Sequence, residues 1–101
     1  MNVTVSQQGT LVRMVLDGDI DEHGAETMNT RFQELGKESF SELVLDFRKV
    51  KYIGSSGIGQ LILFYKETAP LGKKVRIENV SKEIYDLLLD LDINKVISIH
   101  Q

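Results

Sequence analysis

Alternating apolar and polar positions at the start of the chain predict a β-hairpin. Val3 and Val5 have polar neighbours, and residues 8–10 (Gln-Gly-Thr) have the composition of a turn. The apolar run over residues 11–16 then supplies the second strand. A glycine between two aspartates, at residues 17–19, ends that strand.

Three later stretches have apolar residues at spacings of three and four, which predicts amphipathic helices. The first runs from about 22 to 35, the second begins at or beside Ser56 and ends at Pro70, and the third begins after Ser81. Their apolar positions, in chain order, are Ala25, Met28, Phe32 and Leu35; Ile58, Leu61, Ile62, Tyr65 and Ala69; and Ile84, Leu87, Leu88 and Leu91.

Short apolar runs between these helices predict the remaining strands. Residues 43–47 (LVLDF) have the pattern of a strand buried on both faces in the middle of a parallel sheet. Residues 75–77 and 96–99 complete the set. The order of elements predicts an α/β fold with right-handed crossovers: a mixed five-stranded sheet with about three helices, in a single domain over residues 1–101.

Composition and charge narrow the class of protein. A chain of 101 residues with 42% hydrophobic and 27% charged residues is expected to form one core, and without cysteines it has neither disulfides nor a thiolate metal site. The longest apolar runs are about four residues and the start has no export signal, so we expect a cytoplasmic protein without a membrane span. The net charge of -3 argues against nucleic acid as a partner.

A strand-to-helix turn concentrates glycine and hydroxyl groups. Residues 54–59 (GSSGIG) hold three of the eight glycines and two serines, at a helix start where free N–H groups favour an anion. The plainer interpretation is that Ser56 is a helix N-cap or lies beside one, and that the glycines let strand and helix pack closely.

Spacing argues against three catalytic or nucleotide-binding motifs at this turn. A phosphate-binding P-loop needs Lys where Gln60 stands, a dinucleotide fingerprint needs Gly at Ser56, and a hydrolase elbow needs Gly at Ile58. A hydrolase that uses Ser56 would have only His23 and His100 as candidate bases.

Three blocks of sequence, considered together, are more specific than any single motif. They are residues 18–27 (GDIDEHGAET), 43–47 (LVLDF) and 52–59 (YIGSSGIG). In this order and spacing they resemble the STAS domain of bacterial anti-sigma-factor antagonists. The likeness extends through residues 71–75 and the helix over 84–91, so it covers nearly the whole chain. Many members carry a fourth helix after the last strand, where this chain ends at Gln101.

The resemblance assigns roles to individual residues. The family loop usually reads D-S-[SA]-G-[LI]-G, and its phosphoacceptor corresponds to Ser56, with Ser55 before it and Gly57 after it. Gly54 stands where the family usually has Asp. Asp21 matches an acid that lies near the switch loop in the family, and its alternative role is that of an acidic residue at a helix start.

The resemblance also implies a function. It is a partner-switching cycle in which the unmodified protein binds a serine protein kinase that is also an anti-sigma factor, phosphorylation of Ser56 releases it, and a PP2C-type phosphatase resets it. No catalysis, cofactor or metal is expected, and the free protein is expected to be a monomer. The alternatives are a phosphorylation-independent adaptor that holds an anion or nucleotide, a switch with another output such as biofilm control, and a small hydrolase.

Two residues of the second helix are candidates for partner contact. Leu63 lies well outside the apolar stripe and Phe64 lies at its margin, so both are expected to be partly exposed beside the switch loop. The alternative is that both are buried under a neighbouring helix.

Overall fold

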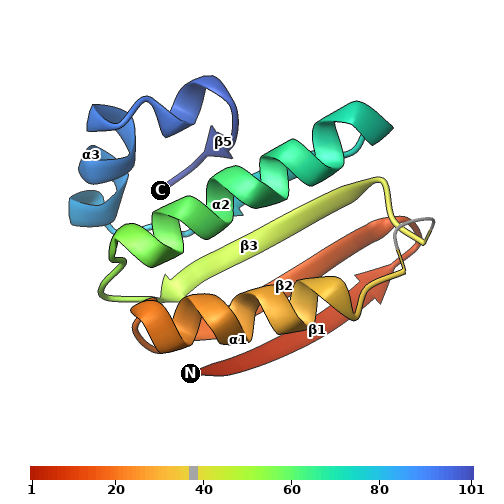
Figure 1. Ribbon diagram of the computed structural model, residues 1–101, viewed down its shortest axis with the longest axis horizontal. Helices are drawn as coiled ribbons and strands as arrows, with labels where there is room; N and C mark the ends of the chain where they lie inside the picture. The colour runs from red at the N-terminus through yellow and green to blue at the C-terminus, as the bar shows by residue number, and fades with distance from the viewer. Residues whose placement is uncertain (37–38) are drawn as a thin grey trace.

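In the computed structural model, five strands form one mixed sheet in the order of the chain, and residues 1–36 and 39–101 are described (Figure 1). Strand β1 is antiparallel to β2, whereas the pairs β2–β3, β3–β4 and β4–β5 are parallel. The strands are β1 (Asn2–Gln8), β2 (Leu11–Asp17), β3 (Glu42–Lys49), β4 (Lys74–Glu78) and β5 (Ser98–Ile99). The helices are α1 (Glu22–Gln33), α2 (Ser55–Thr68) and α3 (Lys82–Asp90), with short 3-10 helices η1 (Ala69–Leu71) and η2 (Ile93–Lys95). The predicted α/β fold with a mixed five-stranded sheet is confirmed.

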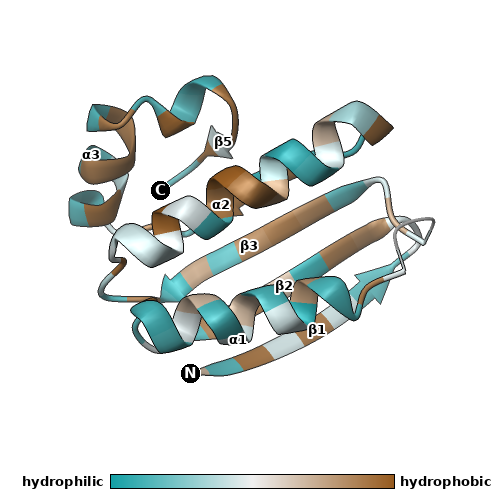
Figure 2. Cartoon of the chain, in the orientation of Figure 1, coloured by the Kyte–Doolittle hydropathy of each residue, from teal (hydrophilic) through white to brown (hydrophobic). Residues whose placement is uncertain are grey.

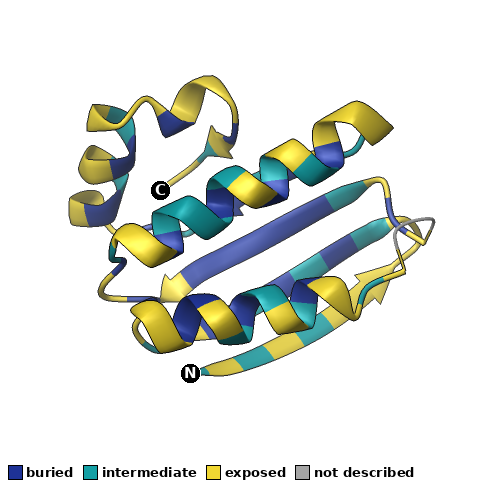
Figure 3. Ribbon diagram, in the orientation of Figure 1, coloured by how far each residue is buried: buried dark blue, intermediate teal, exposed yellow. Residues whose placement is uncertain are grey.

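Strand β3 lies in the middle of the sheet, as its apolar run predicts. Residues 43–47 are all buried, and Figure 3 shows β3 dark blue where β1 is mostly exposed. Figure 2 shows β3 largely brown, whereas α1 is mostly teal and white. Helices α1 and α2 cover the same face of the sheet, and the rings of Phe32 and Phe64 stack between them with centroids 4.2 Å apart.

The opposite face of the sheet is covered by charged side chains. Arg13 pairs with Asp46 at 3.3 Å and with Glu78 at 3.0 Å, and Arg76 pairs with Glu78 at 2.7 Å. Val44 is fully buried on this face, because it alternates with the core-facing positions of β3. The ion pairs therefore shield an apolar centre from water.

Asp46 is the buried carboxylate of this network. Burial alone would raise its pKa, but hydrogen bonds from the Arg48 backbone and the Asn79 side chain, together with the charges of Arg48 and Arg13, hold the pKa of Asp46 below its ordinary value. Its Oδ1 accepts the Arg48 N–H at 3.0 Å.

The ends of some elements differ from the predictions. Helix α1 ends at Gln33, and the last strand is only Ser98–Ile99, because a 3-10 turn precedes it. In α3, Ile84 and Leu88 are buried as expected, but Leu87 and the C-cap residue Leu91 are exposed. The third helix thus buries a narrower stripe than its four apolar positions indicate. No helix in the described part of the chain has the length and apolarity to cross a bilayer.

Candidate functional site

The loops that follow β2 and β3 lie side by side and are joined by backbone hydrogen bonds. Ile20 N–H donates to Tyr52 O at 2.8 Å, and Gly54 N–H donates to Ile20 O at 2.9 Å. Ile20 and Ile53 form an isolated parallel bridge. In open α/β sheets this carboxyl edge of the strands is where ligand sites usually form. The hydrogen bonds hold residues 52–54, and with them the start of α2, in a fixed position.

Helix α2 begins without a side-chain cap in the described part of the chain. The N-cap is Gly54, with extended backbone angles (φ -99°, ψ -176°) and no side chain to cap the helix. The first helical bond runs from Ile58 N–H to Gly54 O at 3.0 Å. The N–H groups of Ser55, Ser56 and Gly57 precede it, and the first turn has no acidic residue. This helix end therefore favours an anion.

Ser56 is exposed in the first turn of α2, one residue after the helix begins. The helix start was predicted at or beside Ser56, which is confirmed, but Ser56 itself is not the N-cap, because Gly54 holds that position. Ser55 is exposed as well, and among the described residues neither hydroxyl makes a side-chain hydrogen bond. Both hydroxyls are therefore accessible to a modifying enzyme.

Gly57 lets α2 approach the neighbouring loop. A Cβ at this position would lie 2.5 Å from Ile20 Cγ2 and 2.8 Å from Ile53 Cγ1, closer than side chains tolerate. The expectation that a glycine allows close packing of strand and helix is therefore confirmed at Gly57. Gly59 is different, since a Cβ there would meet nothing within 4 Å.

Tyr52 is a residue that the sequence interpretation overlooked. Its side chain is 52% exposed, and its hydroxyl oxygen lies 2.8 Å from the place where a Cβ of residue 54 would stand. The phenol thus lies over the residue where the family usually carries Asp. The signal available in the sequence was an aromatic residue two positions before that unusual glycine.

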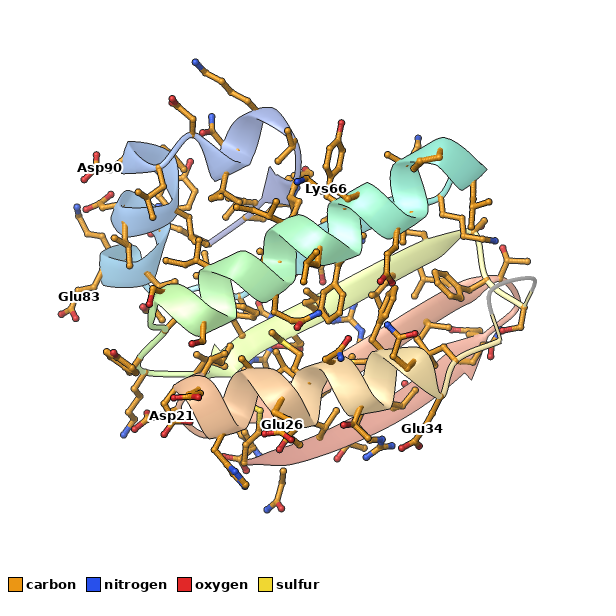
Figure 4. The ribbon with its side chains drawn as sticks, viewed as in Figure 1. Asp21, Glu26, Glu34, Lys66, Glu83 and Asp90 are labelled. Carbon is orange, nitrogen blue, oxygen red and sulfur yellow. The ribbon has the colours of Figure 1, made fainter. Side chains whose placement is uncertain are left out.

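Asp21 is the N-cap of α1. Its Oδ1 accepts the Gly24 N–H at 2.8 Å, so the alternative role of a helix-start acid is confirmed. Asp21 also follows Ile20, the residue that is hydrogen-bonded to Tyr52 and Gly54. Figure 4 shows Asp21 at the end of the molecule where α2 begins. Asp21 therefore caps α1 and lies beside the segment that precedes α2.

The two candidate contact residues of α2 differ in exposure. Leu63 is 49% exposed, as expected, and lies seven residues after Ser56, which places it on the same face two turns further along. The expected exposure of Phe64 is wrong: the side chain is fully buried and stacks on Phe32. The buried stripe is Gly57, Leu61, Phe64 and Thr68, rotated from the predicted one because α1 packs against that side.

The two histidines lie outside α2, which carries Ser56. His100 Nε2 lies 2.7 Å from the Ser98 hydroxyl at the end of β5, and His23 is exposed in the first turn of α1. Within residues 1–36 and 39–101, neither ring is hydrogen-bonded to Ser56.

Comparison with protein families gives one match that spans almost the whole chain. The model of the STAS domain matches residues 2–101. The chain belongs to the STAS domain family. Among curated proteins, the anti-sigma-B factor antagonist of Bacillus subtilis is 24% identical over 87 residues, which are 86% of this chain and 79% of the relative.

Solved structures of STAS proteins share the fold at low sequence identity. A putative anti-sigma factor antagonist from Thermotoga maritima has a TM-score of 0.89 at 13% identity, covering 98% of this chain and 86% of its own. The Bacillus cell fate determinant SpoIIAA in its phosphorylated form has a TM-score of 0.73 at 15% identity, covering 99% and 92%. A sulfate transporter family protein from Wolinella succinogenes has a TM-score of 0.79 at 16% identity, covering 90% and 76%. The fold therefore occurs in both regulators and transporters.

Proposed function

We propose that this STAS protein is a phospho-regulated partner-switching protein of the anti-sigma-factor-antagonist type, cytoplasmic and without catalytic activity, whose switch residue is Ser56. The observation that carries the proposal is the exposed Ser56 in the first turn of a helix whose N-cap, Gly54, has no side chain to cap it. The likeness to the Bacillus subtilis antagonist and to phosphorylated SpoIIAA supports it.

The free protein is expected to tolerate the phosphate. Phosphorylation adds about -1.5 to -2 charges, which takes the formal charge from -3 to about -5. The added charge lies at the positive end of α2, where no acidic residue of the first turn opposes it. The fold should therefore survive modification, and the change in charge acts on binding.

In the complex, the same phosphate would be buried against the partner. The unmodified protein binds a serine protein kinase that serves as an anti-sigma factor or similar regulator, and a PP2C-type phosphatase restores the binding form. Desolvation of the phosphate and repulsion would weaken the complex, and a loss of about 1.4 kcal/mol already lowers affinity tenfold. Leu63, exposed on the Ser56 face of α2, supplies an apolar contact for the partner.

The experiment compares the two adjacent serines. The purified protein is treated with its cognate serine kinase and ATP, and the phosphate is mapped by mass spectrometry. We expect one phosphate on Ser56, retained in Ser55→Ala and absent in Ser56→Ala. Phosphate on Ser55, or equal modification of both variants, would contradict the proposal. Hydrolysis of an activated ester that depends on Ser56 would instead indicate an enzyme.

A second candidate function is a phosphorylation-independent adaptor that binds an anion. A groove of about 390 Å³ lies at the carboxyl edge of β3 and the start of α3. It is lined by Arg48, Val50, Lys51, Ser81, Lys82 and Glu83, three of them cationic. A nucleotide that copurifies with protein that carries no phosphate on Ser56 would favour this function.

A further inference from the structure

We propose that the outer edge of β1 pairs with the same edge of a second copy of this chain, so that two copies form a dimer with one continuous sheet. Strand β1 stands at one end of the strand order, and β2 is its partner within the described sheet. It is 7 residues long, whereas β5, at the opposite edge, has 2 residues. The sheet therefore has one long edge that a further strand can join.

The register of the hairpin indicates which backbone groups of β1 point outward. A two-residue turn joins β1 to β2 and closes on the pair of Gln8 and Leu11, which makes this a hydrogen-bonded pair. Hydrogen-bonded and non-hydrogen-bonded pairs alternate along an antiparallel ladder. The even-numbered residues of β1 therefore bond β2, and Val3, Val5 and Gln7 direct their N–H and C=O groups away from it.

One contact of helix α1 agrees with this direction. The Arg31 guanidinium donates from Nη1 to the Val3 carbonyl at 2.7 Å. A carbonyl oxygen has two lone pairs, so Val3 O can accept a second hydrogen bond. Among residues 1–36 and 39–101, no other hydrogen bond reaches the outward backbone groups of Val3, Val5 and Gln7. These groups are therefore available to the backbone of another strand.

Strand β1 lacks the features with which edge strands usually avoid pairing. Its sequence, NVTVSQQ, has no charged residue and no proline, and its pairs with β2 follow one another without a bulge. Val3 and Val5 are half-buried and pack against the core, whereas Thr4 and Ser6 are exposed on the other side of the sheet. Each copy of the chain carries a net charge of -3, but at this edge two copies meet without opposing like charges on their strands.

A second copy supplies the complementary set of backbone groups. With an antiparallel arrangement and the two-fold axis at Val5, the centre of the strand, the two strands overlap over their whole length. Val5 then bonds its counterpart, and Val3 bonds Gln7 of the other copy, so that each outward N–H meets an outward C=O. The same patch is used on both chains, so the contact closes at two copies.

This dimer keeps Ser56 away from the contact between the two copies. Helix α2 lies on the far side of α1 from β1 (Figure 1), and Ser56 is in the first turn of α2. One assembly would thus present two copies of Ser56. The result differs from the monomer expected from the sequence, because the spacing of residues does not reveal which strand lies at an edge.

The test places charges at Thr4 and Ser6, which lie opposite each other across the proposed axis. In the double variant Thr4→Lys with Ser6→Lys, lysines of the two copies face each other. In Thr4→Lys with Ser6→Glu, each lysine faces a glutamate instead. Sedimentation equilibrium of the full chain, at concentrations up to about 1 mM, measures the dissociation constant of the dimer.

We expect the wild type to dimerise reversibly in this range. The double-lysine variant should dimerise at least about fivefold more weakly than the wild type, and the lysine–glutamate variant at least as tightly as the wild type. The two added lysines take the net charge from -3 to -1, so a general effect of charge would strengthen association instead.

A wild type that stays monomeric over the whole range would overturn the inference, as would equal dissociation constants for the two double variants. Assemblies larger than a dimer would contradict a closed two-fold contact. Both substituted positions are exposed, and circular dichroism of each variant establishes that the fold is intact.

Discussion

At the scale of single residues, the glycines at the start of α2 have different tasks. Gly57 is enclosed by Ile20 and Ile53, whereas Gly59, one half-turn later, faces open space. The sequence pattern treats the two alike, because both belong to the motif GSSGIG. Only the positions of the neighbouring loops distinguish a glycine needed for packing from one that is not.

Alanine substitutions at these two glycines should shift stability in opposite directions. Gly57→Ala forces its methyl group against Ile20 and should cost about 1–3 kcal/mol of unfolding free energy, as overpacking does. Gly59→Ala removes a flexible residue from a helix interior and should add about 0.5–1 kcal/mol. Urea unfolding of both variants measures this, and a common sign for the two changes would refute the packing argument.

Adjacent residues of α2 provide a second comparison. Phe64→Ala removes a fully buried ring that stacks on Phe32 and should cost about 3–5 kcal/mol. Leu63→Ala removes a half-exposed side chain and should cost less than about 1 kcal/mol, while it weakens partner binding. Leu71→Ala, exposed in η1 at the far end of α2, is the control for binding. A kinase affinity unaffected by Leu63→Ala would exclude this contact.

At the scale of elements, two substitutions of Asp21, the N-cap of α1, distinguish a structural role from a role in partner binding. Asp21→Ala should lower the unfolding free energy by about 1 kcal/mol, because the Gly24 N–H loses its acceptor. Asp21→Asn keeps an acceptor but removes the charge, so its stability should stay near that of the wild type. If Asp21→Asn weakens kinase binding while its stability is unchanged, the charge contributes to recognition. Equal stability of Asp21→Ala and the wild type would contradict the capping role.

The types of the elements and their order could be predicted from the sequence. Which face of a helix is buried could not always be predicted. The pattern over residues 43–47 indicates an interior strand, because a short run of apolar residues is typical of a strand buried on both faces. In α2, apolar residues occupy more than half of the wheel, so periodicity alone did not determine whether Phe64 or Ile62 faces the core. Contact with Phe32 of α1 determines it, and that contact spans 32 residues of sequence.

Only part of the site could be predicted from the sequence, because side-chain directions do not follow from residue spacing. Glycine and serine composition marked the start of α2, and the resemblance singled out Ser56. The position of Tyr52 over Gly54 depends on a side-chain direction that spacing does not provide.

At the scale of the whole molecule, stability should depend on pH through the charged face of the sheet. The folded pKa of Asp46 is lowered, so its ionised form favours the folded state at neutral pH. This stabilisation should be present above the ordinary carboxyl pKa of 3.8 and decline as the pH falls through the lower folded value. In Asp46→Asn, the loss of unfolding free energy between pH 5 and pH 2 should be smaller than in the wild type. An identical pH dependence would show that Asp46 does not contribute.

The central claim concerns binding of the whole domain to its partner. Its most direct test is a calorimetric titration of the cognate serine kinase with the unmodified protein and with protein phosphorylated on Ser56. The account predicts at least tenfold weaker binding after phosphorylation, a loss of about 1.4 kcal/mol or more, with the melting temperature changed by only a few degrees. Equal affinity of the two forms would contradict it.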